Sequence, residues 1–376
     1  MKYYIIAGEA SGDLHGASLI KEIKKSDPKA IINCWGGDLM SKAGGKIIKH
    51  FKDISFMGFW EVFKNLFTIF QNLNFCKKSI EKFKPDVIIF IDYPGFNLRI
   101  AKWARKKGFN NHYYISPQVW AWRESRVKTI KENVDSLYVI LPFEKSFYEK
   151  KYRFKVDYVG HPLMEHIPKR KIDKNFIKKI NSLTNKPLIA LLPGSRKQEI
   201  NKILPELIKV SKRFENFQFI IAGAPGRSIY DYKPILNETQ IPVIFNNTYN
   251  LIQLSEAAIV TSGTATLETA LLGTPQIVCY KSSYLSFLIA KFVVKLKYIS
   301  LVNIIMEKGV IDELIQFNCN SKNICLSLEK ILNKSYAKKI KFNYQKLFDI
   351  LNRGGASKIT SSLILKRIKK KKLLAF

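Results

Sequence analysis

The sequence predicts an α/β fold of two Rossmann-like domains that face a central cleft. First, short apolar runs, typical of strands buried on both faces, alternate with helical stretches along the chain. Second, several of these runs end in a glycine-containing turn that leads directly into a helix. Third, the pattern restarts near the middle of the chain, and 376 residues are enough for two domains.

The domain boundaries follow from this restart. The segment His161-Pro162-Leu163 closes the first set of strands, so we place an N-terminal domain over residues 1–165. A second domain is expected over 166–345, and a C-terminal helix with a basic tail over 346–376. The tail carries six positive charges in seven residues, Lys366–Lys372, which suits either a solvated end or an anionic lipid surface.

The net charge of +33 indicates polyanionic partners, which are nucleic acid, anionic lipid head groups or phosphorylated substrates. Five cysteines without metal or disulfide spacing indicate free thiols in a reducing cytosol. The N-terminal apolar run is too short for a signal peptide, and no apolar run approaches the ~20 residues of a membrane span. We therefore expect a protein that is soluble or lies on a membrane.

The first strand, Lys2–Ala7, leads into a loop that reads GEASGD, Gly8–Asp13. Its glycine spacing fits neither a dinucleotide fingerprint nor a P-loop, because no lysine follows. The carboxylates Glu9 and Asp13 would repel a phosphate. The loop suits a neutral, hydroxyl-rich substrate or an acid–base role, unless both acids only favour the helix start through its dipole.

The stretch Met57–Leu73 predicts a helix with an unusually wide apolar face. Its apolar side chains fill about 180° of a helical wheel, against ~100° for an ordinary core-facing helix. A deeply buried helix is one explanation. The other is an interfacial surface or acyl-chain pocket, because five side chains on it are aromatic: Phe59, Trp60, Phe63, Phe67 and Phe70.

The apolar run Pro85–Asp92 predicts a strand buried on both faces. Ligands of open parallel sheets sit beyond the carboxyl ends of strands, so Asp92 is a candidate general base. Its alternative role is to cap the next helix. The following strand, Asn111–Ile115, leads into residues 116–123, whose two tryptophans suit either a substrate wall or internal packing.

The second half repeats the strand–turn–helix unit. Strand Leu188–Leu192 runs into Pro193-Gly194-Ser195-Arg196, where the arginine and a helix start can bind phosphate. Strand Ala257–Val260 runs into Ser262-Gly263-Thr264, a second helix start of this kind. Glu268 lies one turn into that helix, where its carboxylate can accept two sugar hydroxyls. An ordinary strand–turn–helix is the alternative.

A sugar transferase that holds its diphosphate through a metal usually carries a D-x-D pair, and this sequence has none. We therefore expect no metal and no cofactor. Arg196 and the two helix starts would neutralise a leaving diphosphate instead.

Seven stretches, in order along nearly the whole chain, resemble the lipid-A-disaccharide synthases, a family of GT-B-type glycosyltransferases. They are GEASGD (8–13), IDYPGFN (91–97), YISPQVWAWR (114–123), VGHPL (159–163), LLPGSR with Glu199-Ile200, SGTATLE (262–268), and Asn303 with Glu313-Leu314-Ile315-Gln316. Gly95 stands where the family often has a second Asp, which concentrates the role of base on Asp92.

The resemblance implies inverting transfer of 2,3-diacylglucosamine from UDP to 2,3-diacylglucosamine 1-phosphate, giving a β-1,6 disaccharide and UDP. It implies a peripheral place on the cytoplasmic face of the bacterial inner membrane, an anionic surface as partner, and no nucleic acid, and it leaves a homodimer open. The implied catalytic residues are Asp92, Glu9, Ser11 and Asn303. The implied UDP ligands are Ser195, Arg196, Gly263, Thr264, Thr266 and Glu268.

Two other readings remain. Another GT-B enzyme, such as a muropeptide N-acetylglucosaminyltransferase or a UDP-sugar 2-epimerase, would share the fold, but the GEASGD opening argues against both. A basic membrane- or nucleic-acid-binding module would explain the charge. It would not explain three strand–turn–helix loops that carry Asp92, Arg196 and Glu268.

Overall fold

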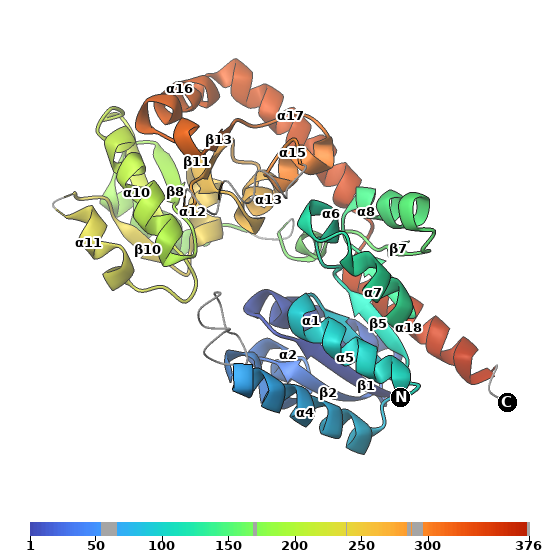
Figure 1. The fold of residues 1–376 in the computed structure, drawn as a ribbon. Coiled ribbons are helices and arrows are strands. Elements are labelled where there is room, and N and C mark those ends of the chain that lie inside the picture. The colour runs from blue at the N-terminus through green and yellow to red at the C-terminus, as the bar shows by residue number, and fades with distance from the viewer. Residues whose placement is uncertain (54–65, 168–170, 238, 284–286, 288–295, 374–376) are drawn as a thin grey trace. The chain divides into compact units, whose positions relative to one another are not determined.

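A computed structural model describes residues 1–53, 66–167, 171–237, 239–283, 287 and 296–373. The chain divides into two compact units. Unit 1 is Met1–Met164 together with Leu351–Phe376, and unit 2 is Glu165–Ile350. The last helix, α18 (Ala356–Leu373), thus belongs to the N-terminal unit (Figure 1).

The described part of unit 1 holds a parallel sheet of seven strands in the order β3-β2-β1-β4-β5-β6-β7. Its strands are β1 (Lys2–Ala7), β2 (Ile31–Gly36), β3 (Lys46–His50), β4 (Val87–Ile91), β5 (Asn111–Tyr114), β6 (Ser136–Val139) and β7 (Asp157–Tyr158). Its α-helices, apart from α18, are α1 (Ala10–Ser26), α2 (Asp38–Lys42), α4 (Leu66–Phe83), α5 (Pro94–Lys106), α6 (Val119–Trp122), α7 (Arg126–Asn133) and α8 (Pro142–Ser146).

Both faces of this sheet are buried, which explains why its central strands read as continuous apolar runs. Successive side chains of β1 alternate between two cores: Tyr4 and Ile6 pack with helices α4, α5 and α7. Tyr3 and Ile5 pack on the other face with α1 and with Ile364 of α18. Unit 1 is therefore a three-layer helix–sheet–helix structure (Figure 1).

The described part of unit 2 holds a second parallel sheet, of six strands in the order β10-β9-β8-β11-β12-β13. Its strands are β8 (Leu188–Leu192), β9 (Gln218–Gly223), β10 (Val243–Phe245), β11 (Ser255–Thr261), β12 (Gln276–Tyr280) and β13 (Glu313–Ile315). Its α-helices are α9 (Lys174–Leu183), α10 (Lys197–Ser211), α11 (Lys233–Leu236), α12 (Thr248–Leu254), α13 (Thr264–Leu271), α15 (Leu301–Met306), α16 (Ser321–Leu332) and α17 (Lys334–Leu351).

In each sheet the strand order reverses at one point. In unit 1 the chain builds β1, β2 and β3 outward and then returns to place β4 on the other side of β1. In unit 2 it builds β8, β9 and β10 and then places β11 on the other side of β8. Loops diverge at such a switch point, and open α/β sheets bind their ligands there.

One helix extends beyond the sequence prediction. Helix α4 continues ten residues past the predicted end at Leu73, because Cys76 and Ile80 supply further core contacts. Residues 57–65 of the predicted helix lie outside the described residues. No helix in the described part of the chain combines the length and apolarity of a membrane span.

Candidate functional site

The catalytic residues that the sequence predicted in unit 1 follow the strands at its switch point. Glu9 follows β1 and Asp92 follows β4, and these two strands are hydrogen-bonded neighbours. Gly8 also brings the two loops together, since a Cβ there would lie 2.3 Å from the ring of Tyr93. Ser11 lies in the first turn of α1 and is exposed.

The backbone around Asp92 is held in an uncommon conformation. Asp92 and Tyr93 have φ angles of 43° and 49°, in the left-handed region that costs a residue with a side chain roughly 1–3 kcal/mol. Two side-chain hydrogen bonds hold the turn, one from the next strand and one from the helix that follows the turn. The Tyr113 hydroxyl donates to the Asp92 carbonyl at 2.5 Å, and Asn97 Nδ2 donates to it at 2.7 Å. The stretch IDYPGFN, residues 91–97, thus contains both the turn and one of the side chains that hold it.

The Asp92 carboxyl is electrostatically suited to take up a proton. Its pKa is raised to about 6, first by burial and then by the charge of the neighbouring Glu9 carboxylate, while the Tyr93 N–H opposes the shift. A general base works best when its pKa lies near the working pH. This carboxyl is therefore a stronger base than an exposed Asp and is still ionised at neutral pH.

Asp13, the other acid of the first loop, has a structural role. It is buried and accepts N–H bonds from Gly37, Leu39 and Met40 at 2.8, 3.1 and 3.0 Å. These bonds tie α1 to the start of α2. The sequence left the roles of both acids open. In the structure Asp13 stabilises the fold, whereas Glu9 is the acid that lies next to Asp92.

In unit 2, Ser195 and Arg196 follow β8, and Gly263 and Thr264 follow β11, the strand next to β8. The four residues therefore lie at one edge of one sheet, at its switch point. The first turn of α13 presents N–H groups that have no acceptor within the helix, and Gly263 and Thr264 are exposed there. This is an anion-binding arrangement.

The turn before α10 is less open than the sequence suggested. Glu199 Oε2 accepts the N–H groups of Ser195 and Arg196, both at 3.1 Å, and its Oε1 lies 3.2 Å from the Arg196 guanidinium. Gly194 permits this closure, since its φ is +114° and a Cβ would lie 2.6 Å from Glu199 Oε2. The Arg196 side chain is 76 % exposed, so its ion pair is weak and the guanidinium can bind another anion.

Two further predicted ligands on α13, Thr266 and Glu268, differ in how deeply they are buried. Thr266 is fully buried, and its hydroxyl donates to the Gly263 carbonyl at 2.8 Å, which shapes the turn that carries the anion site. Glu268 is partly buried; burial raises its pKa, and a hydrogen bond with Tyr249 opposes the shift. Glu268 thus offers a carboxylate one turn beyond the exposed N–H groups.

The amide of Asn303 is engaged entirely within unit 2. Its Nδ2 donates to the Ile311 carbonyl at 2.9 Å and to Glu313 Oε1 at 2.8 Å, and its Oδ1 accepts from Val310 and Ile311 N–H. Glu313 also accepts the Ser300 hydroxyl at 2.7 Å. Asn303 and Glu313, both in the sequence motif, therefore shape the segment before β13, a connection that sequence reasoning did not find.

Of the five aromatic residues predicted to contact acyl chains, Phe67 and Phe70 lie in the described part of α4. They are 74 % and 61 % exposed. Phe59, Trp60 and Phe63 lie outside the described residues. The deeply buried alternative does not hold for the two that are described.

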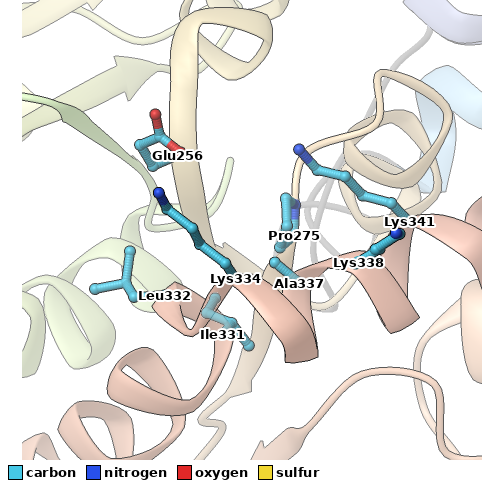
Figure 2. A pocket seen from close by; sticks show the side chains of 8 residues that line it. All are labelled: Glu256, Pro275, Ile331, Leu332, Lys334, Ala337, Lys338 and Lys341. Carbon is cyan, nitrogen blue, oxygen red and sulfur yellow. The ribbon is translucent and has the colours of Figure 1, made fainter.

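A hollow of about 210 Å³ lies away from these sites, on unit 2 (Figure 2). Glu256 and Pro275, which line it, stand at the amino ends of β11 and β12. The anion-binding turn follows the carboxyl end of β11, so the hollow is not the nucleotide site. Among the described residues, no group of three or more His, Cys, Asp or Glu side chains is placed to hold a metal ion.

Comparison with known proteins identifies the family. A model of the lipid-A-disaccharide synthetase family matches residues 3–366. The curated lipid-A-disaccharide synthase of Syntrophus aciditrophicus is 39 % identical over 374 residues, 97 % of each chain, and that of Coxiella burnetii is 36 % identical over 366 residues, 96 % of each. The chain belongs to the lipid-A-disaccharide synthase family.

Membership of the lipid-A-disaccharide synthase family confirms the prediction, made from seven motifs, of a glycosyltransferase of lipid A biosynthesis. Solved structures confirm the GT-B-type α/β fold. UDP-GlcNAc 2-epimerase of Neisseria meningitidis aligns with a TM-score of 0.69 at 15 % identity, covering 97 % of this chain and 100 % of that one. The glycotransferase of kitacinnamycin aligns with a TM-score of 0.63 at 11 % identity, covering 98 % and 99 %.

Proposed function

We propose that this chain transfers 2,3-diacylglucosamine from its UDP donor to the 6′-hydroxyl of 2,3-diacylglucosamine 1-phosphate, with inversion, and releases UDP. Family membership over residues 3–366 carries the proposal. The two switch-point sites support it, because one supplies a carboxylate of raised pKa and the other an anion-binding turn.

Unit 1 would supply the base. Asp92 takes the proton from the acceptor hydroxyl as its oxygen attacks the anomeric carbon, and the bond from that carbon to the diphosphate breaks. Glu9 acts on this step through its charge, which raises the pKa of Asp92. Ser11, which is exposed two residues after Glu9, would contact the acceptor sugar.

Unit 2 would hold the UDP. The N–H groups at the start of α13, with Gly263 and Thr264, bind the diphosphate, and Glu268 binds the ribose hydroxyls. Arg196 leaves its weak ion pair with Glu199 and binds the diphosphate instead, and Ser195 is a further UDP ligand in this proposal. Thr266 and Asn303 act as positioning residues, since their polar groups are engaged within the protein. These parts stabilise a leaving diphosphate without a metal ion or a cofactor.

The acylated substrates call for a membrane surface. The exposed Phe67 and Phe70 and the net charge of +33 suit a peripheral place on anionic lipid at the cytoplasmic face of the inner membrane. Nucleic acid is not a partner in this proposal, and a homodimer would be compatible with it.

The direct test is incubation with the UDP-diacylglucosamine donor and the monosaccharide 1-phosphate acceptor, with and without EDTA. We expect a disaccharide 1-phosphate and equimolar UDP in both reactions. Mass spectrometry of the lipid fraction checks the product. UDP release without a disaccharide, or loss of product on chelation, would contradict the proposal.

Membrane binding gives a second prediction. Replacing Phe67 and Phe70 together by Ser should weaken binding to vesicles of anionic phospholipid by at least about 10-fold, because two exposed aromatic rings no longer enter the interface. Co-sedimentation measures this. Phe342→Ser is the matched control, since Phe342 is 61 % exposed but lies on α17. Equal binding by the double variant and the control would show that Phe67 and Phe70 of α4 do not contact the lipid.

A further inference from the structure

Glu144 is a buried carboxyl for which the proposed mechanism has no role. It is 1 % exposed and is the third residue of α8, which follows β6. Its Oε2 accepts the N–H groups of Ile140 at 3.1 Å and Leu141 at 2.9 Å, which caps the helix. The cap occupies one carboxylate oxygen and leaves the other to be explained.

The second oxygen reaches a different element. Oε1 accepts the indole N–H of Trp120 at 3.2 Å, and the Trp120 ring meets the Phe143 ring edge-on, with centroids 4.8 Å apart. Trp120 lies on the short helix α6, which follows β5. One carboxyl therefore closes the turn before α8 and fixes α6 to it.

This junction lies at the same sheet edge as Asp92. Strands β4, β5 and β6 are consecutive neighbours in the sheet and run parallel, so the segments that follow them meet at one edge. Asp92 follows β4, Trp120 follows β5 and Glu144 follows β6. The charge of Asp92 also contributes to the electrostatic environment of Glu144.

We propose that Glu144 is a positioning residue of the acceptor site, which holds the Trp120 indole and so keeps residues 116–123 in the arrangement that binds the acceptor sugar. This inference rests on the proposed function. It assigns the tryptophan-containing loop to binding and leaves proton transfer to Asp92.

The hydrogen bond from the Trp120 indole to Glu144 should depend on pH, because an ionised carboxylate is a stronger acceptor than a neutral acid. The pKa of Glu144 is raised to about 7, first by burial and to a smaller extent by the charge of Asp92, although the three hydrogen-bond donors oppose the shift. Tyr148 and Tyr158 also interact with Glu144, and burial raises the pKa of each, so both stay neutral near pH 7. As pH falls through 7, Glu144 takes up a proton and the indole is held less firmly.

Two substitutions test this role. Trp120→Phe removes the indole N–H and leaves the cap of α8 intact. Glu144→Gln keeps the shape, but its amide cannot accept both the cap and the indole N–H. Each variant should raise the KM for the acceptor about 10-fold and leave the kcat and the KM for the UDP donor within about twofold. Trp103→Phe, on α5, is the matched control.

The pH profile separates positioning from mere stability. In the wild type, the KM for the acceptor should rise as pH drops below about 7, whereas in Glu144→Gln it should be raised and flat. An acceptor KM and pH profile equal to those of Trp103→Phe in both variants would overturn the inference. Failure of the wild type to form the disaccharide would instead overturn the proposed function, so the two outcomes are distinct.

Discussion

Replacing Asp92 by Asn should lower the kcat for disaccharide formation by about 10²–10⁴-fold while UDP binding is unchanged, because the acceptor hydroxyl loses its base and unit 2 is untouched. Steady-state kinetics and UDP titration calorimetry measure the two quantities. Asp53→Asn, which changes an exposed carboxyl of unit 1, should behave as the wild type. Turnover near the wild-type level would remove Asp92 from the role of base.

The assignment of Asp92 as the base also predicts how the kcat depends on pH. Only the ionised form of Asp92 can accept the proton, and its pKa is raised to about 6, so the wild-type kcat should fall as pH drops through about 6. Glu9→Gln removes a charge that raises this pKa. The acid limb of the kcat profile should therefore move to lower pH, and an unmoved limb would separate Glu9 from Asp92.

Loss of the nucleotide ligands is the second large effect. Arg196→Ala and Glu268→Ala should each weaken UDP binding by about 10- to 100-fold, because each removes a charge-assisted contact to the diphosphate or the ribose. Isothermal titration with UDP measures the change.

Unit 2 offers two controls for this measurement. Arg213→Ala alters an exposed arginine near the other end of α10, and Glu256→Ala alters an exposed carboxyl at the amino end of β11. Both should bind UDP as the wild type does. If the Arg196 and Glu268 variants match these controls, the nucleotide lies elsewhere.

The sequence predicted the strands on which both sites depend. The run at Leu188–Leu192 is a strand with those bounds, and the run ending at Asp92 is β4, because strands buried on both faces leave a continuous apolar signal. Strand β3, Lys46–His50, was missed, since it lies at the sheet edge and its sequence, KIIKH, holds only two apolar residues.

The features that the sequence could not predict were mostly contacts between residues far apart in the chain. The placement of β4 beside β1 brings Glu9 to Asp92 across more than eighty residues of chain, and strand order leaves no local signal. Closure of the α10 turn by Glu199 was hidden for another reason. The spacing of a capping box is visible, but which oxygen serves the cap and which the guanidinium depends on side-chain geometry.

The return of the last helix to unit 1 constrains how the chain folds during synthesis. Ile364 and Ile368 of α18 complete one core of the first sheet, and Arg367 pairs with Asp157 at 2.7 Å. Unit 2 is one continuous segment, Glu165–Ile350, and can fold as soon as that segment leaves the ribosome. Unit 1 begins before unit 2 and is completed after it, so an unfinished chain carries a sheet face that is only partly covered until α18 is made.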